Sequence, residues 1–237
     1  MNIYYINLDR CVGRRKKMQE LYTNAKRVPA YDGELLGSYD DIYLIRGYDM
    51  NNNEIGCSLS HIRAIYTAYK NGDRFALIME DDIYNSFEYL WRENLTKIIS
   101  SIPEDTECVQ LHCINPDVIS EMLLTKQKFV DWRDNSWGMG CYYITRKGMH
   151  KIVQKYIKNN VIYLPICMEN KADFKLIYGF LKTMTYTRPL FDHQICESTI
   201  HSSHLETIHY AALCIICEYF SNIGYGGQDK NKLNRLL

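Results

Sequence analysis

Short apolar runs that alternate with helical stripes limit the folds open to this chain more than any other feature. Residues 3–8, 75–79, 108–112 and 141–145 are compact apolar runs of strand length, and each ends at charged or polar residues. Between them, apolar residues recur at the i, i+3, i+4 spacing of amphipathic helices, as over residues 14–25. Strands alternating with helices predict an α/β fold, with a Rossmann-like, mainly parallel sheet covered by helices on both faces.

Length and composition favour one globular domain. The 237 residues are 46% hydrophobic and 24% charged, which excludes a disordered, collagenous or coiled-coil chain. We find no internal repeat and no clear linker. Residues 1–237 are therefore predicted to form a single domain, with the C-terminal part as a smaller lobe.

The charge balance excludes one class of partner. The 28 basic and 28 acidic side chains cancel, so no long-range field attracts nucleic acid or an anionic membrane. We expect no nucleic-acid partner, and any phosphate site must be local.

Cysteine usage and apolar segments indicate the compartment. Nine cysteines in a chain of this size are expected to be reduced thiols, which favours the cytoplasm. Residues 1–11 lack the pattern of a signal peptide, and the apolar stretch 210–220 is too short to span a membrane. It is expected to be a buried helix, with contact to a membrane surface or to a second subunit of a homodimer as alternatives. The richness in Asn, Lys, Ile and Tyr is typical of a low-GC genome, bacterial or of a large DNA virus, whose protein would act in the cytoplasm of the infected host.

Three consecutive carboxylates follow the apolar run 75–79. Alternation along an extended chain predicts that Glu80 and Asp82 share one side, with Asp81 on the other. Charges at the end of a buried strand are costly unless they meet a cation or water, and ligands of open α/β sheets bind at this edge. Oxygen ligands suit Mn²⁺ or Mg²⁺. A solvated turn or a helix cap is the structural alternative.

Four motifs occur in a fixed order. They are YINLDR at residues 5–10, followed by Arg14 and Arg15; RVPAYDG at 27–33; EIGCSLSH at 54–61; and LIMEDD at 77–82. Together they resemble glycosyltransferase family 25, the group of lipooligosaccharide-type and collagen-type sugar transferases, and a weaker likeness continues to about residue 203.

The resemblance implies a fold, a reaction and its partners. It implies a GT-A arrangement in which residues 1 to about 112 bind a nucleotide sugar and residues 113–237 bind the acceptor. The implied donor is UDP-galactose or UDP-glucose, the acceptor a hydroxyl of a saccharide or a protein-linked glycan, and the cofactor Mn²⁺ or Mg²⁺.

Site residues are carried over from the matching motifs. Asp82, with Glu80, is implied to hold the metal, and Glu80 or Asp81 to hold the donor ribose or a metal-bound water. The implied donor-binding residues are Asn7, Asp9, Arg10, Arg14, Arg15, Asp32, Gly56, Ser60, His61, Glu80 and Asp81.

Several of these residues have structural alternatives. At least one of Arg14 and Arg15 is expected to face outward, and Asp32 also suits a turn. His61 also suits a hydrogen-bonded core position. Gly56 is expected to permit close backbone approach, and Ser58 or Ser60 to cap a helix.

The acceptor half is expected to supply the catalytic base if the reaction inverts the anomeric centre. Asp173 is the implied base, with Glu169 as the other candidate, although their i, i+4 spacing also suits a solvated helix face. His193, His201 and His204 are further candidates for metal or phosphate contacts. A binding module without turnover and a metal-dependent phosphoesterase remain alternative functions.

Overall fold

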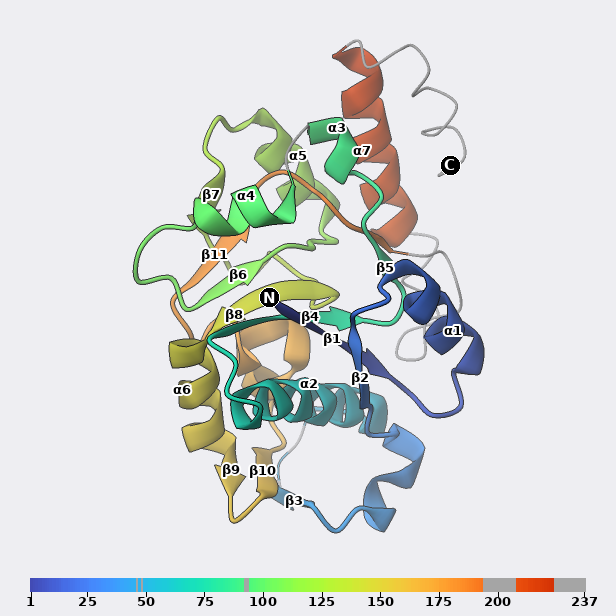
Figure 1. Cartoon of the computed structure of the whole chain (residues 1–237), viewed down its shortest axis with the longest axis vertical. Helices are drawn as coiled ribbons and strands as arrows, with labels where there is room; N and C mark the ends of the chain where they lie inside the picture. The colour runs from blue at the N-terminus through green and yellow to red at the C-terminus, as the bar shows by residue number, and fades with distance from the viewer. Residues whose placement is uncertain (46, 48, 92–93, 194–207, 224–237) are drawn as a thin grey trace.

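The computed structural model describes residues 1–45, 47, 49–91, 94–193 and 208–223. A seven-stranded sheet crosses the middle of the molecule (Figure 1). Its strands, in spatial order, are β2 (Lys26–Pro29), β1 (Asn2–Asn7), β4 (Phe75–Glu80), β8 (Cys141–Thr145), β6 (Cys108–Gln110), β11 (Thr183–Tyr186) and β7 (Phe129–Asp131).

Five of these seven strands share one direction. β1 pairs in parallel with β2 and β4, and β11 pairs in parallel with β6. β8 runs antiparallel to both of its neighbours, β4 and β6, and β7 runs antiparallel to β11. The predicted α/β class is confirmed, but the fourth predicted strand, β8, does not belong to a parallel βαβ unit. Its apolar run could not reveal this, because a buried strand has the same pattern in either direction.

Helices cover both faces of the sheet, as predicted. In Figure 1, α2 (Asn52–Lys70) and α6 (Arg146–Tyr156) lie on one side, and α1 (Val12–Leu21) and α4 (Leu95–Ser100) on the other. Strand alternation separates the two cores: Tyr4 packs in the cluster that includes Leu59 of α2, and Tyr5 in the cluster that includes Met18 of α1.

A third hydrophobic cluster lies at the end of the molecule that is uppermost in Figure 1. It joins α3 (Glu88–Trp91), α5 (Pro116–Leu124) and α7 (Tyr210–Asn222). The stretch 210–220 is therefore a helix that buries one face, including Ala212, Leu213 and Phe220.

Two segments differ from what the sequence leads us to expect. Residues 34–53 are polar and aperiodic, so we expect a loop with little structure of its own, but they contain most of the 3-10 helix η1 (Gly33–Ser38) and all of β3 (Ile42–Ile45). β3 pairs with β10 (Val161–Pro165), which pairs with β9 (Ile157–Lys158), and this non-local sheet has no local signal in the sequence. We also expect a helix over residues 174–181 from the sequence, but the structure has a short π-helix, η3 (Ala172–Leu176), followed by turns.

The N-terminus of α2 also lies earlier than expected. Asn51 caps the helix, and its side chain and that of Glu54 form a reciprocal capping box. Ser58 and Ser60 lie two turns inside the helix, so neither is the cap.

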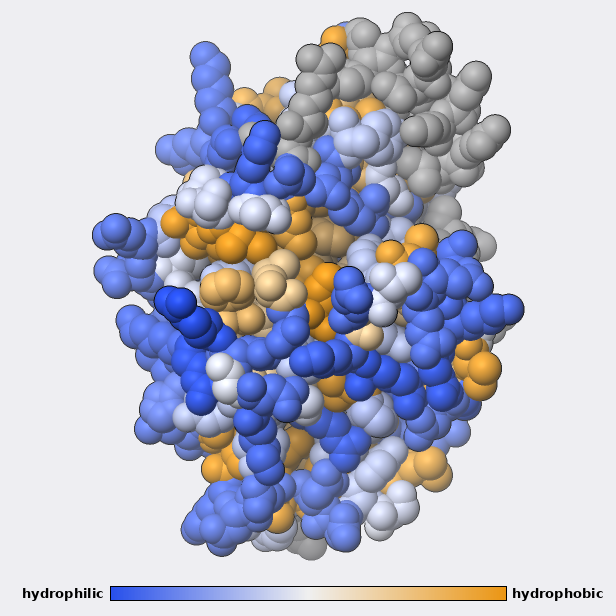
Figure 2. Space-filling model, viewed as in Figure 1, coloured by the Kyte–Doolittle hydropathy of each residue, from blue (hydrophilic) through white to orange (hydrophobic). Residues whose placement is uncertain are grey.

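The surface is mixed in character. Figure 2 shows a largely hydrophilic face, with hydrophobic residues gathered in the middle of the view over the sheet. Among the described residues, no helix combines the length and the hydropathy that a membrane crossing needs. β5 (Ile83–Tyr84) and β12 (Asp192–His193) complete the fold as a small antiparallel pair.

Candidate active site

One edge of the central sheet opens into a cavity of about 630 Å³. The segments that follow β1, β2, β4 and β6 all reach it, because these strands share one direction. β8 runs the other way, so it brings the residues that precede it, Met139 and Gly140, to the same edge. α2 and the segment around η3 also line the cavity. The cavity thus lies where open α/β sheets bind ligands.

Two of the three consecutive carboxylates share one guanidinium. Nη1 of Arg14 lies 3.2 Å from Oδ1 of Asp81 and 2.9 Å from Oδ2 of Asp82. The amide of Asn7 donates a second hydrogen bond to Asp81, at 2.5 Å. All three charged side chains are largely buried. The expected grouping of Glu80 with Asp82 is wrong, because β4 ends at Glu80 and strand alternation does not continue beyond it.

Burial and the neighbouring charges shift the pKa values of Asp81 and Arg14. Loss of solvent and the neighbouring Asp82 raise the pKa of Asp81 to about 6, although Arg14 and Asn7 act in the opposite direction. Burial alone would lower the pKa of Arg14, but Asp81 and Asp82 raise it above its ordinary value. The guanidinium therefore stays charged and holds the two carboxylates together.

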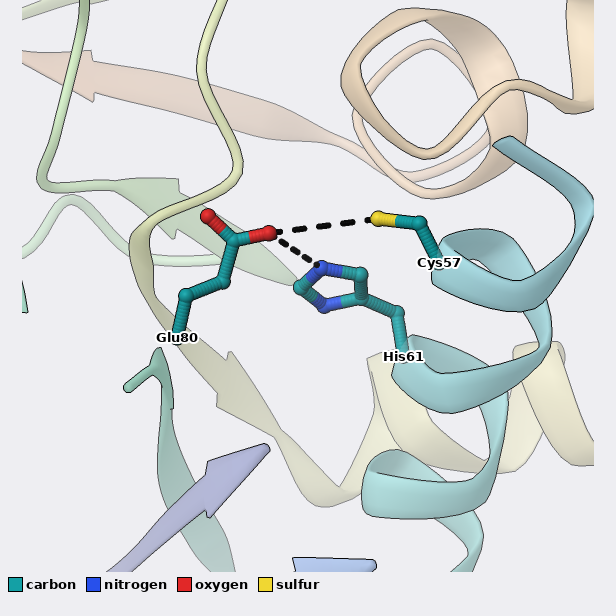
Figure 3. Close-up of side chains that lie close together, drawn as sticks. All are labelled: Cys57, His61 and Glu80. Carbon is teal, nitrogen blue, oxygen red and sulfur yellow. Dashed lines mark hydrogen bonds and ion pairs between the residues drawn. The ribbon is translucent and has the colours of Figure 1, made fainter. Parts of the chain in front are cut away.

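Glu80 points instead toward α2. Its Oε1 lies 3.3 Å from Nε2 of His61 and 3.9 Å from Sγ of Cys57, as Figure 3 shows. His61 is fully buried, and its Nδ1 lies 3.3 Å from the hydroxyl of Tyr142 on β8. Both ring nitrogens of His61 thus have partners, which agrees with the hydrogen-bonded core position considered from the sequence.

The first motif divides between cavity and surface. Arg10 and Asp32 form an ion pair at the cavity wall. Asp9 is exposed and pairs with Arg27, and the guanidinium of Arg15 donates to the backbone carbonyl of Asp9. Arg14 faces inward and Arg15 does not, as expected for at least one of the pair.

Gly56 and Ser60 attach α2 to the segment after β2. A Cβ on Gly56 would lie 2.7 Å from the carbonyl oxygen of Tyr31, so the expected close approach is confirmed. The hydroxyl of Ser60 accepts from the backbone N–H of Tyr31 at 2.8 Å and donates to the carbonyl of Gly56. These contacts fix the cavity wall that carries Cys57 and His61.

The candidate bases do not share one helix. Glu169 is exposed in the 3-10 helix η2 (Met168–Asn170), and Asp173 lies in η3, with Lys171 in an extended conformation between them. The backbone of η3 borders the cavity, because Ala172 and Phe174 line it. The side chains of Asp173 and His193 lie outside the described set, as do His201 and His204 entirely.

The sequence of this chain is similar to those of known proteins. A family model described as glycosyltransferase family 25, LPS biosynthesis protein, matches residues 1–168, more than half of the chain. The chain belongs to glycosyltransferase family 25. The matched region includes β4, the three carboxylates and α2.

A curated relative carries the same family name. A glycosyltransferase 25 family member of Drosophila pseudoobscura pseudoobscura is 32% identical over an alignment of 116 residues, and the alignment covers 42% of this chain. The match spans only 18% of that relative's length.

Two solved structures of glycosyltransferases are similar to this chain at lower sequence identity than the curated relative. One, described as involved in glycosylation of the major capsid of PBCV-1, has a TM-score of 0.36 and 13% identity, covering 87% of this chain and 98% of its own. The galactosyltransferase LgtC, in complex with donor and acceptor sugar analogs, has a TM-score of 0.34 and 12% identity, covering 98% and 100%.

This family 25 chain also has cavity residues that sequence reasoning missed. Lys171 lines the cavity and pairs with Glu54 at 2.7 Å, across 117 positions of sequence. Cys57 stands inside the third motif, but its type alone gave no reason to select it. His112 and Trp137 reach the cavity from the connection between β6 and β8, which has no recognisable pattern.

Proposed function

We propose that this chain transfers a hexose from a UDP-sugar to a hydroxyl of a saccharide or a protein-linked acceptor. The observation that carries the proposal is the placement of Asp81, Asp82 and Arg14 together, buried, at the carboxyl edge of β1 and β4. They line a cavity of about 630 Å³, a size typical of small-molecule sites. Family membership supports the same reaction class.

The two aspartates suit a divalent cation. They already converge on one positive charge, that of Arg14, and their oxygens are the hard ligands that Mn²⁺ and Mg²⁺ prefer. Asp82 would therefore hold the ion, with Asp81 beside it in place of Glu80. When bound, the ion would supply charge neutralisation to the departing diphosphate.

The surrounding residues support this arrangement. Asn7 orients Asp81 through its 2.5 Å hydrogen bond, and Arg27 donates to the side-chain oxygen of Asn7 at 2.9 Å. Arg14 lines the cavity, where its guanidinium would pair with phosphate oxygens. Arg10 and Asp32 border the same cavity, where we propose that they contact the nucleoside.

We propose that the acceptor approaches from the wall formed by η3. An inverting transfer needs a carboxylate to take the proton of the acceptor hydroxyl on the face opposite the leaving diphosphate. Asp173 lies between Ala172 and Phe174, which both line the cavity, and is preferred over the exposed Glu169. Asp173→Asn should lower kcat by about 10²-fold or more, and Glu169→Gln should leave kcat close to that of the wild type.

The decisive experiment measures release of nucleoside diphosphate from a panel of sugar nucleotides, with Mn²⁺ and saccharide acceptors. Asp82→Ala should abolish the Mn²⁺-dependent rate. Asp117→Asn, at an exposed position in the first turn of α5, should not change it. An unchanged rate in Asp82→Ala would refute the role of Asp82.

The same assay separates the alternative functions. A binding module would bind a sugar nucleotide in calorimetry without releasing nucleoside diphosphate. A phosphoesterase would cleave simple phosphate esters readily, whereas a transferase without acceptor hydrolyses its donor slowly. Either result would overturn the proposed transfer.

A further inference from the structure

We propose that Cys57, His61 and Glu80 form a second metal site on the cavity wall, selective for Zn²⁺ or a similar borderline-soft ion. The site is separate from the one proposed at Asp81 and Asp82. It does not depend on the proposed transfer reaction, because it follows from the three side chains alone.

The ligand atoms already have near-coordination spacing. One atom from each side chain lies within 4.8 Å of the other two. Zn²⁺ bonds of about 2.0–2.3 Å in a tetrahedron place ligand atoms about 3.3–3.8 Å apart. Nε2 of His61 is 3.3 Å and Sγ of Cys57 is 3.9 Å from Oε1 of Glu80. Small side-chain movements would therefore complete the site.

Helix geometry explains why the residues meet. Cys57 and His61 are four positions apart on α2, so they lie on the same face one turn from each other. Glu80 ends β4 and faces this turn (Figure 3). The contacts of Gly56 and Ser60 with the Tyr31 backbone hold that part of α2 in place.

The histidine has the outer partner that a metal ligand needs. A ligating imidazole usually donates its second N–H to a fixed acceptor, which sets the tautomer and the ring orientation. Here Nδ1 of His61 lies 3.3 Å from the hydroxyl of Tyr142, inside the core. With the proton on Nδ1, the lone pair of Nε2 points toward Cys57 and Glu80.

The donor set distinguishes this site from that of the aspartates. Thiolate, imidazole and a single carboxylate favour Zn²⁺ or Co²⁺, whereas oxygen ligands alone favour Mn²⁺ or Mg²⁺. Three protein ligands leave a fourth position, and all three residues line the cavity. On binding, Cys57 would release its thiol proton to solvent and Glu80 would remain ionised, so the bound ion would be approximately charge-balanced.

The test uses metal-free, full-length protein titrated with CoCl₂ as a spectroscopic probe. A site with one thiolate should give a thiolate-to-Co²⁺ charge-transfer absorption that saturates at one equivalent and disappears when ZnCl₂ is added. Cys57→Ser should lose this absorption. Cys214→Ser, on α7, should keep it and serves as the matched thiol control. Tyr142→Phe should weaken Co²⁺ binding by about 10–100-fold.

Thermal unfolding with and without ZnCl₂ gives a second readout. Zn²⁺ should raise the Tm of the wild type but not that of Cys57→Ser or Cys57→Ala, by mass action. Asp82→Ala should retain the Co²⁺ absorption even though it loses turnover, so the two proposals can fail separately. No charge-transfer absorption in the wild type, or an absorption that survives Cys57→Ser, would overturn the site and leave a Tyr142, His61 and Glu80 hydrogen-bond chain in its place.

Discussion

Nη1 of Arg14 lies 2.9 Å from Oδ2 of Asp82, so a basic residue from the first helix and an acidic residue from the end of β4 meet inside the cavity. The same nitrogen contacts Asp81 at 3.2 Å. Arg14 therefore contributes its positive charge to the candidate active site as well as its hydrogen bonds, because it balances two buried carboxylates.

Arg14→Gln should lower kcat/KM by about 10²–10³-fold, because the two buried carboxylates lose their shared cation and the diphosphate loses a partner. Arg14→Lys keeps the charge without the planar fork, so it should recover only part of this loss. Lys17→Gln, exposed on the same helix, is the control and should match the wild type in steady-state kinetics. Wild-type kinetics in Arg14→Gln would contradict the assignment.

Glu107 should make stability fall in acid. Burial would raise the pKa of this carboxyl, but hydrogen bonds from Lys151 and the backbone of Lys182, together with Lys147, lower it below its ordinary value of 4.5. A lowered folded-state pKa adds stability that is present above pH 4.5 and is lost as the pH falls through the lower value.

Glu107→Gln should therefore cost about 1–3 kcal/mol of unfolding free energy at pH 7 and make stability less dependent on pH below 5. Urea denaturation over a pH series measures both effects. Glu121→Gln, in an exposed pair with Arg133, should change stability by less than about 1 kcal/mol. Equal effects at the two positions would argue against the buried network.

Gly56→Ala should destabilise the fold by about 1–3 kcal/mol, since overpacking forces the neighbouring backbone to shift. The new Cβ would stand 2.7 Å from the Tyr31 carbonyl oxygen and 3.0 Å from the backbone nitrogen of Gly33. Gly13→Ala is the matched control, because a Cβ there meets nothing within 4 Å and alanine favours the helix. Its Tm should be unchanged or slightly higher, whereas a Gly56→Ala protein as stable as the wild type would refute the tight contact.

The sequence was sufficient for the local features of this fold. The bounds of β8, and the carboxylates at the end of β4, follow from apolar runs that end at polar residues. The α/β class follows from the order of these runs along the chain. Strand direction did not follow, because burial on both faces of the sheet makes central strands such as β4 and β8 almost continuously apolar in either direction.

Several residues that line the cavity could be named from the sequence, but how they group could not. Alternation along β4 was extended by two residues too many, and this paired Glu80 with Asp82 when Asp81 and Asp82 share Arg14. Lys171 and Glu54 lie 117 positions apart, and β10 pairs with β3 over a similar separation, so neither contact has a local pattern in the sequence. The division into donor and acceptor halves stays a prediction, and both halves contribute strands to one sheet.

The position of β8 also bears on the order of assembly during synthesis. Residues 141–145 insert between two strands that leave the ribosome earlier, so β4 and β6 have unsatisfied edges until this part of the chain emerges. A nascent chain from which residues 141–145 have not yet emerged would expose backbone groups that attract other chains. Between the synthesis of β4 and the emergence of β8, each of these two strands therefore keeps open the edge that β8 later fills.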